Sequence, residues 1–288
     1  MLYQAILAAG LALFAVAPSA AHAQEFRFEA VPLFDNCGDP SLKHAQTDGI
    51  TLGISPSPPY SSIDPATNKG TGLDVDINEA ALKWLGITKI RYEVMPFGQL
   101  IAAMLSHRID VVAGNIHITP DRLKAVSFTG PAWWYGPAIV TQKNKIATAP
   151  NEFPALKGKS VGASAGSAAD EYLRHDGVTV TPFQTDAEEF AAITTGRIDY
   201  LVEDDVKVLA YIKANPAAPI GLVPNVVVPD DMIYGYGYGY ARYALRKEDC
   251  SLRVGYTQAL AEMRGNGEMS YLLKKYGLSN RNLMFFPF

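Results

Sequence analysis

The sequence is short of several features that mark common classes of protein. It contains only two cysteines and three tryptophans, 19% of its residues are charged, and its formal net charge is −4. The mild acidity argues against a nucleic-acid-binding protein, which needs a basic face to contact phosphates. Disorder is excluded as well, because 48% of the residues are hydrophobic and 10% are aromatic, enough to form a core.

Metal-binding spacings are missing too. His44, His107, His117 and His175 stand singly, and none of them is close to a cysteine in the way that zinc sites require. We therefore expect neither a metal nor a cofactor, and we identify no catalytic group.

Long hydrophobic runs are absent except in the first 23 residues. There an apolar stretch from Ala5 to Val16 is followed by Pro18 and by the small-x-small sequence Ala21–Ala23. The stretch is too short to span a hydrocarbon core of about 30 Å. It predicts a signal peptide cleaved after Ala23 and a soluble periplasmic protein, with a short buried or membrane helix as the alternative.

Export changes the interpretation of the two cysteines. An even number of cysteines in an oxidising compartment favours a disulfide, here between Cys37 and Cys250. Such a bond would tie an N-terminal arm, residues 24–48, to a segment near the C-terminus. Two unpaired buried thiols are the alternative.

From residue 49 onward, short apolar runs alternate with helical periodicity, which is typical of an α/β fold. The length favours about two domains. We predict strands at 50–54, 90–95, 109–113, 160–163, 178–180 and 198–202, and helices at 72–85, 97–107, 186–194, 251–264 and 268–276.

The two halves share a short repeat. Arg-Ile-Asp occurs at 108–110 and at 197–199, each time between a predicted helix and a predicted strand, which favours two similarly built lobes. We expect lobe 1 at 49–138 and 237–288 and lobe 2 at 139–236. Residues 136–145 and 234–240 are predicted to be extended crossings, the second with tyrosines on one face and glycines on the other. Two crossings imply a hinge and a cleft between the lobes.

Arg122 is the first candidate for ligand binding. Thr119, Pro120 and Asp121 suit the start of a helix, whereas a cation in the first turn opposes the helix dipole. The position therefore favours an anionic partner, such as a ligand carboxylate held by the guanidinium fork. The alternative is a surface arginine paired with Asp121 or water.

A second segment could help to hold the same carboxylate. The step from Gly166 to Ser167 precedes a predicted helix and presents backbone N–H groups that suit an anion, although an ordinary serine cap explains it equally well. In the second lobe, Glu203, Asp204 and Asp205 follow a strand, where ligands of open α/β sheets bind, and one of them could neutralise a ligand cation.

Aromatic residues would complete the site. Tyr60 follows a proline-rich break and Phe97 opens a helix, so either ring could stack on the ligand. We assign the run Trp133–Tyr135 to core or hinge packing rather than to ligand contact.

These features resemble family 3 of the bacterial extracellular solute-binding proteins, the polar amino-acid type that feeds ABC importers. The resemblance covers about residues 49–278 and rests on the order and spacing of several short motifs. They are GLDVD at 72–76, RIDVV at 108–112, TPDR at 119–122, FTGP at 128–131, GASAGS at 162–167, RID at 197–199 before Asp204, GE at 267–268 and YGL at 276–278.

The resemblance implies a type II periplasmic binding protein fold with hinge strands and a cleft. It also implies a role for each matching position. Arg122 and the amides of Ser167 and Ala168 would hold an α-carboxylate, Asp204 an amino group, Asn115 and His117 would form hydrogen bonds, and Tyr60 and Phe97 would sandwich the ligand.

Two positions depart from the family pattern. Ser55 stands where many members carry an acid, and His117 replaces a small polar residue. These departures favour a solute with less exposed positive charge. The region 85–98 is similar to binding proteins for ectoine and hydroxyectoine, whose ligand pairs a carboxylate with an amidinium.

The function predicted from this resemblance is that of the binding component of an ABC importer. Its partners would be a small zwitterionic ligand and an inner-membrane permease, and the protein would be a monomer. One alternative is a secreted cyclohexadienyl (arogenate or prephenate) dehydratase, for which His117, Glu203 or Asp205 could act as the acid. Another is a ligand-sensing subunit that uses the same cavity.

Overall fold

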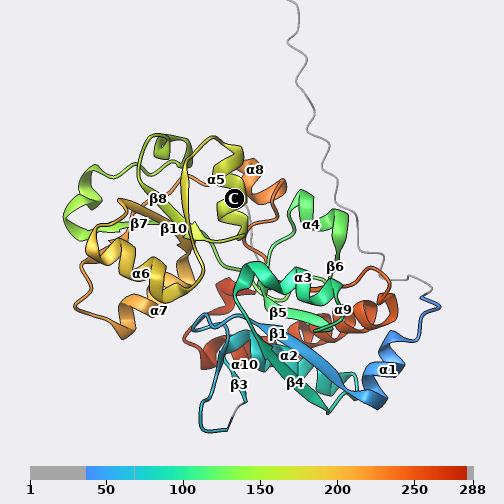
Figure 1. Cartoon of the computed structure of the whole chain (residues 1–288). Helices are drawn as coiled ribbons and strands as arrows, with labels where there is room; N and C mark the ends of the chain where they lie inside the picture. The colour runs from blue at the N-terminus through green and yellow to red at the C-terminus, as the bar shows by residue number, and fades with distance from the viewer. Residues whose placement is uncertain (1–36, 68, 284–288) are drawn as a thin grey trace, which may run out of the picture. The chain divides into compact units, whose positions relative to one another are not determined.

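The computed structural model describes residues 37–67 and 69–283 (Figure 1). The expected signal peptide, its cleavage after Ala23 and part of the N-terminal arm lie outside the described residues. Within the described part of the chain, no helix combines the length and the apolar character needed to cross a membrane.

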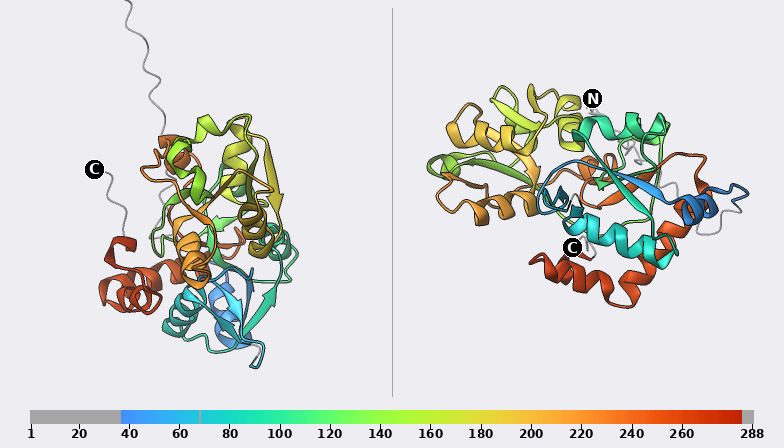
Figure 2. Two further views of the ribbon diagram at one scale, coloured as in Figure 1. Left: turned by 90° about the vertical axis from the view of Figure 1, so that its left-hand side faces the viewer. Right: turned by 60° about the horizontal axis from the view of Figure 1, so that its bottom comes forward.

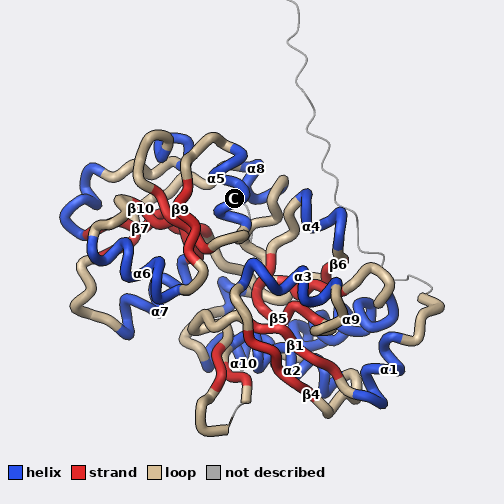
Figure 3. Tube along the Cα trace, viewed as in Figure 1, coloured by secondary structure: helices blue, strands red, loops and turns tan. Residues whose placement is uncertain are grey.

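Two five-stranded sheets form the framework of two lobes (Figure 3). The first has the strand order β4-β1-β5-β12-β6, in which β1 pairs in parallel with β4 and β5, whereas β12 runs antiparallel to β5 and β6. Its strands are β1 (Ile50–Ile54), β4 (Ile90–Val94), β5 (Val111–Ile116), β6 (Ser127–Phe128) and β12 (Arg242–Leu245).

Helices cover both faces of this sheet because its strands are apolar on both sides. In β5, Val111 and Ala113 belong to the cluster formed with α2 (Leu73–Trp84), α9 (Cys250–Gly265) and α10 (Glu268–Lys275), whereas Val112 packs with α3 (Leu100–Leu105). Figure 2 shows α9 and α10, in red, side by side.

The second sheet has the order β11-β7-β10-β8-β9, again with helices on both faces. Its strands are β7 (Pro137–Gln142), β8 (Val161–Ser164), β9 (Val180–Phe183), β10 (Tyr200–Asp204) and β11 (Ile220–Leu222). The helices around it are α5 (Ala168–His175), α6 (Asp186–Thr195) and α7 (Asp205–Ala214).

Short elements complete the described chain. They are the hairpin of β2 (Ser62–Ile63) and β3 (Gly70–Thr71), the helices α1 (Ser41–Asp48), α4 (Pro120–Ala125) and α8 (Asp230–Tyr234), and the 3₁₀ turns η1 (Phe97–Gln99), η2 (Lys143–Thr148), η3 (Phe153–Leu156) and η4 (Asn280–Asn282).

The Arg-Ile-Asp repeat builds the same corner in both lobes. The amides of Arg108 and Ile109 donate to the carbonyl of Ala103 at the end of α3, and those of Arg197 and Ile198 donate to Ala192 near the end of α6. Each corner leads directly into a strand, β5 or β10. The predicted α/β fold with two similarly built lobes is confirmed.

The prediction for residues 234–240 is wrong. Helix α8 extends to Tyr234, and turns follow it instead of an extended strand. Gly237 and Gly239 have φ values of 59° and 108°, and a Cβ atom on Gly239 would lie 2.0 Å from the Trp134 ring. The glycines therefore serve tight turns and close packing rather than one face of a strand.

The other predicted crossing, 136–145, is extended only in its first part. Residues 137–142 form β7, which lies between β10 and β11, and η2 follows. Just before β7, Trp134 pairs antiparallel with Tyr240, so the two segments that connect the lobes run side by side.

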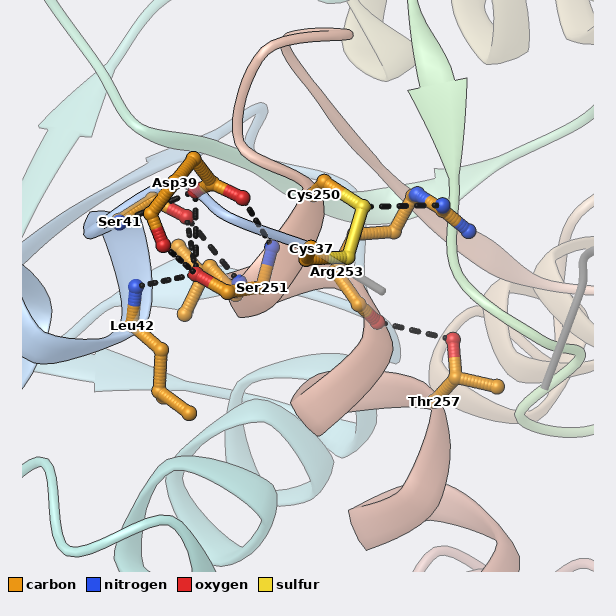
Figure 4. The surroundings of a disulfide bond; sticks show 9 residues. Cys37, Asp39, Ser41, Leu42, Cys250, Ser251, Arg253 and Thr257 are labelled. Carbon is orange, nitrogen blue, oxygen red and sulfur yellow. Dashed lines mark hydrogen bonds between the residues drawn. A yellow bond between two sulfur atoms is a disulfide. The ribbon is translucent and has the colours of Figure 1, made fainter. Parts of the chain in front are cut away.

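The N-terminal arm is fastened to the first lobe. Cys37 and Cys250 form the predicted disulfide, and α1 packs on α9. Beside the disulfide, the Asp39 carboxylate accepts a hydrogen bond from the Ser251 amide at 2.8 Å (Figure 4). The bond therefore closes a well-packed junction at the start of α9.

Candidate functional site

A cavity lies where the carboxyl ends of strands from both sheets meet. Its space, measured as the volume open to the centre of a water molecule, is about 50 Å³. One water molecule needs about 10–15 Å³ of such space, so the cavity has room for a small solute. Its lining residues are Ser55, Ser57, Tyr60, Ser61, Phe97, Gly114, Asn115, His117, Ser164, Ala165, Ser167, Ala168, Phe183, Gln184, Asp186, Glu203, Asp204, Lys207 and Tyr238.

Seven of the eight ligand-binding residues expected from the sequence line this cavity. They come from both sheets, and they are Tyr60, Phe97, Asn115, His117, Ser167, Ala168 and Asp204. Arg122 does not line the cavity itself. Its guanidinium lies 5.5 Å from the centre of the ring of Phe97, which is a lining residue.

Arg122 is buried between the two lobes. It lies in α4, capped by the Thr119 hydroxyl, and its side chain is bonded to two backbone carbonyls. One η nitrogen donates to His117 at 2.8 Å and the other to Gly166, in the second lobe, at 2.6 Å. Burial lowers the pKa of Arg122 to about 10.

The buried charge of Arg122 forms no salt bridge within residues 37–67 and 69–283, although Glu171 acts on it from a greater distance. Asp121, its partner in the alternative interpretation, pairs with Lys124 at 2.6 Å instead. Among the described residues, no carboxylate oxygen lies within 4.0 Å of the Arg122 guanidinium. A buried guanidinium held only by carbonyls is costly unless an anion approaches it.

The start of α5 is organised around Ser167. Its hydroxyl caps the helix by accepting a hydrogen bond from the Asp170 amide at 3.1 Å, so the ordinary capping role is present. The Ser167 amide, expected to face a carboxylate, donates to the carbonyl of Ser164. Ala168, the first helical residue, lines the cavity.

Asp204 lies at the carboxyl end of β10 and is buried. Its oxygens accept hydrogen bonds from the Tyr238 hydroxyl at 2.6 Å and from the Asn115 side chain, in the first lobe, at 3.2 Å. Burial, followed by repulsion from Glu203, raises the pKa of Asp204 well above its usual value. Both partners are neutral, so a ligand cation would stabilise the ionised carboxylate.

Lys207 occupies the centre of a buried charge cluster. Its ammonium group is 3.2 Å from Asp186, 3.1 Å from Glu189 and 3.0 Å from Glu203. Burial opposes its charge, but the surrounding acids raise the pKa of Lys207 well above the usual value. The lysine therefore remains charged and holds three carboxylates, of which Asp186 and Glu203 line the cavity.

Aromatic rings form one side of the cavity. His117 stacks on Tyr238 with 4.2 Å between ring centres, and the Tyr60 ring lies 5.5 Å from Trp133. Burial and the positive charge of Arg122 hold the pKa of His117 well below its usual value, so the imidazole is neutral. Among the described residues, neither the Tyr60 hydroxyl nor Nε2 of His117 has a hydrogen-bond partner.

Trp133 belongs to the core, in keeping with the sequence interpretation. Its indole N–H donates to the buried carboxylate of Asp74 at 2.9 Å, and the ring packs against Tyr135. Asp74 also accepts a hydrogen bond from the Tyr243 hydroxyl at 2.9 Å. Burial raises the pKa of Asp74 to about 7.

Asp186, Lys207 and Tyr238 line the cavity but were not predicted as site residues from the sequence. Lys207 lies in the first turn of α7, four positions after Glu203 at the end of β10, and this spacing could have indicated an ion pair. Asp186 and Glu189 could not have been joined to that pair, because they lie on a different helix, α6. Tyr238 was visible only as part of a repeating tyrosine–glycine run.

A family model and individual proteins of known function both match this chain. The model of the bacterial extracellular solute-binding proteins, family 3, matches residues 50–279. The histidine-binding periplasmic protein of Escherichia coli (strain K12) is 28% identical over 231 residues, covering 78% of this chain and 86% of that protein.

Solved structures agree with this match. The P235GK mutant of ArgBP from T. maritima aligns with a TM-score of 0.71 and 26% identity, over 82% of this chain and 99% of that one. An ancestral arginine-binding protein bound to glutamine aligns with a TM-score of 0.66 and 32% identity, over 79% and 96%.

Proposed function

The chain belongs to family 3 of the bacterial extracellular solute-binding proteins, and from that premise we propose that it binds a small amino-acid-like solute. The solute would carry a carboxylate and an amino or amidinium group, and the protein would close on it and deliver it to an ABC permease. The observation that carries this proposal is that Arg122 is buried between the two lobes and forms no salt bridge with any acid in the described part of the chain.

The carboxylate of the solute would approach Arg122 and the start of α5. A guanidinium has five N–H donors in a planar fork, and the described residues take two of them. An incoming carboxylate would compensate the buried charge and would contact both lobes at once. Such a ligand favours the closed arrangement because it has less to bind when the lobes separate.

The amino group of the solute would pair with Asp204. This carboxylate is buried, lines the cavity and is bonded only to neutral donors among the described residues. Tyr60 and Phe97 would pack against the carbon atoms of the solute. The named relatives, which include histidine- and arginine-binding proteins, support an amino-acid class of ligand.

Transport rather than catalysis is the role that we propose. The acids offered for a dehydratase are engaged: Glu203 is paired with Lys207, and Asp205 accepts bonds from the amides of Gly136 and Val206. Neutral His117 stacks on Tyr238. No observation favours the dehydratase over a binding protein.

The localisation, oligomeric state and lobe boundaries predicted from the sequence complete the proposal. The protein would be exported by a signal peptide cleaved after Ala23 and would act in the periplasm as a monomer. Its lobes would comprise residues 49–138 and 237–288, and residues 139–236. The paired segments at Trp134 and Tyr240 would serve as the hinge.

A thermal-shift screen of L-amino acids and ectoines tests the function. A ligand at 100 times its Kd should stabilise the protein by about 2.7 kcal/mol. Arg122→Ala should abolish this stabilisation, because it removes the cation that faces the carboxylate. Lys124→Ala is the matched control: it removes an exposed cation from the same helix and should leave the shift unchanged.

The result that contradicts the proposal is specific. If Arg122→Ala and Lys124→Ala respond alike to an effective ligand, the carboxylate is not held by Arg122. If no amino acid or ectoine shifts the melting temperature, the solute class is wrong. Conversion of the ligand to a new product during incubation would favour the enzyme.

A further inference from the structure

The charge cluster around Lys207 bears on which amino acid fits the cavity. We propose that Lys207 makes the cavity selective for a small amino acid with an uncharged polar side chain, such as a hydroxyl or carboxamide, over one with a cationic side chain. This inference rests on the proposed function and narrows its substrate class.

The first step concerns the oxygens of the three acids around Lys207. Each carboxylate uses one oxygen for the lysine ammonium group. The second oxygen of Asp186 accepts a hydrogen bond from the Ser57 hydroxyl, and that of Glu189 accepts one from the Ser164 hydroxyl. The second oxygen of Glu203 accepts a hydrogen bond from the Asp204 amide. All six oxygens are thus already bonded, and one buried cation serves all three groups.

The second step concerns the acid that remains. Asp204 has only the neutral donors Tyr238 and Asn115 among the described residues, so it is the cavity acid left for a ligand cation. One α-ammonium group satisfies it. A guanidinium or a second ammonium group on the side chain of the ligand would have to compete with Lys207 for its carboxylates. Ser55, which also lines the cavity, has no negative charge with which such a cation could pair instead.

The third step concerns the polar atoms that lack a partner. The Tyr60 hydroxyl and Nε2 of His117 are buried in lining residues and have none among the described residues. Both are neutral groups, and Gln184 adds a neutral amide to the wall. Neutral donors and acceptors match a hydroxyl or carboxamide, and a buried polar atom without a partner is costly.

The size of the cavity agrees with this assignment. Its 50 Å³ corresponds to about four waters at roughly 10–15 Å³ each on the same measure. That space suits a short side chain better than the long one of arginine.

The test is a calorimetric titration of the unaltered protein with L-serine, L-glutamine and L-arginine. We expect serine or glutamine to bind at least about tenfold more tightly than arginine, the effect of one unmatched charged hydrogen bond. Tighter binding of arginine would overturn this inference and leave the proposed function intact. If none of the three amino acids binds while an ectoine does, this inference is overturned and the proposed function stands; if no amino acid and no ectoine binds, both are overturned.

A pair of variants tests the part played by Lys207. Lys207→Met frees the three acids and should shift the ratio of affinities at least about tenfold toward arginine, whereas Lys207→Arg should keep the original ratio. A general loss of structure would weaken all ligands alike and would not move this ratio. An unchanged ratio in Lys207→Met would refute the role of the lysine.

A second variant keeps the test possible if Lys207→Met fails to fold. If Lys207→Met does not fold, Lys207→Met with Glu203→Gln removes one cation and one acid together. We expect its affinity ratio to move toward arginine as well, because Asp186 and Glu189 lose their cation. A ratio equal to that of the unaltered protein would count against the inference.

Discussion

Replacing both Cys37 and Cys250 by serine should destabilise the protein without affecting its cavity. The disulfide joins residues 213 positions apart, and the chain-entropy relation for a loop of that length gives about 5 kcal/mol at 25 °C. Measured values are typically about 2–4 kcal/mol. At roughly 2–4 °C per kcal/mol for a domain of this size class, about 3 kcal/mol lowers the melting temperature by about 6–12 °C.

The contacts around the disulfide explain why the loss should stop there. The amide of Leu42 still donates to the Ser251 hydroxyl at 3.1 Å, and the Ser251 amide still donates to Asp39. The arm should therefore remain docked on α9 in the folded state. Neither cysteine lines the cavity, so ligand affinity should be unchanged.

The assay is a thermal melt of the double variant beside the oxidised parent, followed by a ligand titration of both. The parent measured after reduction is the matched control, and it should melt together with the variant. Melting of the double variant within about 1 °C of the oxidised parent would refute the entropic reasoning. A large change in ligand affinity would refute the separation of the disulfide from the site.

Three further perturbations test other parts of the structure. Gly239→Ala should cost about 2–4 kcal/mol in chemical denaturation, because it combines a positive φ with overlap on Trp134, whereas Gly86→Ala, also at positive φ but with open space, should cost less. Asp204→Asn should weaken amino-acid binding about tenfold or more by calorimetry, and equal affinity would contradict the ammonium assignment. Asp74 has a pKa raised from 3.8 to about 7, so its neutral form stabilises the folded state by up to about 4 kcal/mol below pH 4, and this stabilisation is lost as the pH rises through 7. The unfolding free energy of Asp74→Asn should lack this decline, and parallel pH profiles of parent and variant would refute the role of Asp74.

Local rules explain what the sequence could predict. The strand before Ser55, the helix that starts after Thr119 and the two Arg-Ile-Asp corners all depend on residues that are neighbours along the chain. Apolar runs with helical or alternating periodicity, together with residues suited to helix starts, predicted these elements correctly. The disulfide was predictable from the count of cysteines and the expected compartment.

Contacts between distant segments explain what the sequence could not predict. The glycines at 237 and 239 looked like one face of a strand, but they form turns in which Gly237 packs against Ile118 and Gly239 against Trp134, each more than a hundred positions earlier. The cluster of Lys207 joins acids from α6 and β10, and no spacing relates them. The position of Arg122 in the helix suggested an anionic partner, but neither its burial nor the carbonyls that hold it could be predicted.

The bond between Cys37 and Cys250 has a topological consequence. Every strand that the structure describes, from residue 50 to residue 245, lies inside the covalent ring that this bond closes. A protease that nicks any loop within the ring opens the backbone but releases no fragment, because the two pieces stay linked through sulfur. A clipped molecule would thus migrate as one species on a non-reducing gel and as two after reduction.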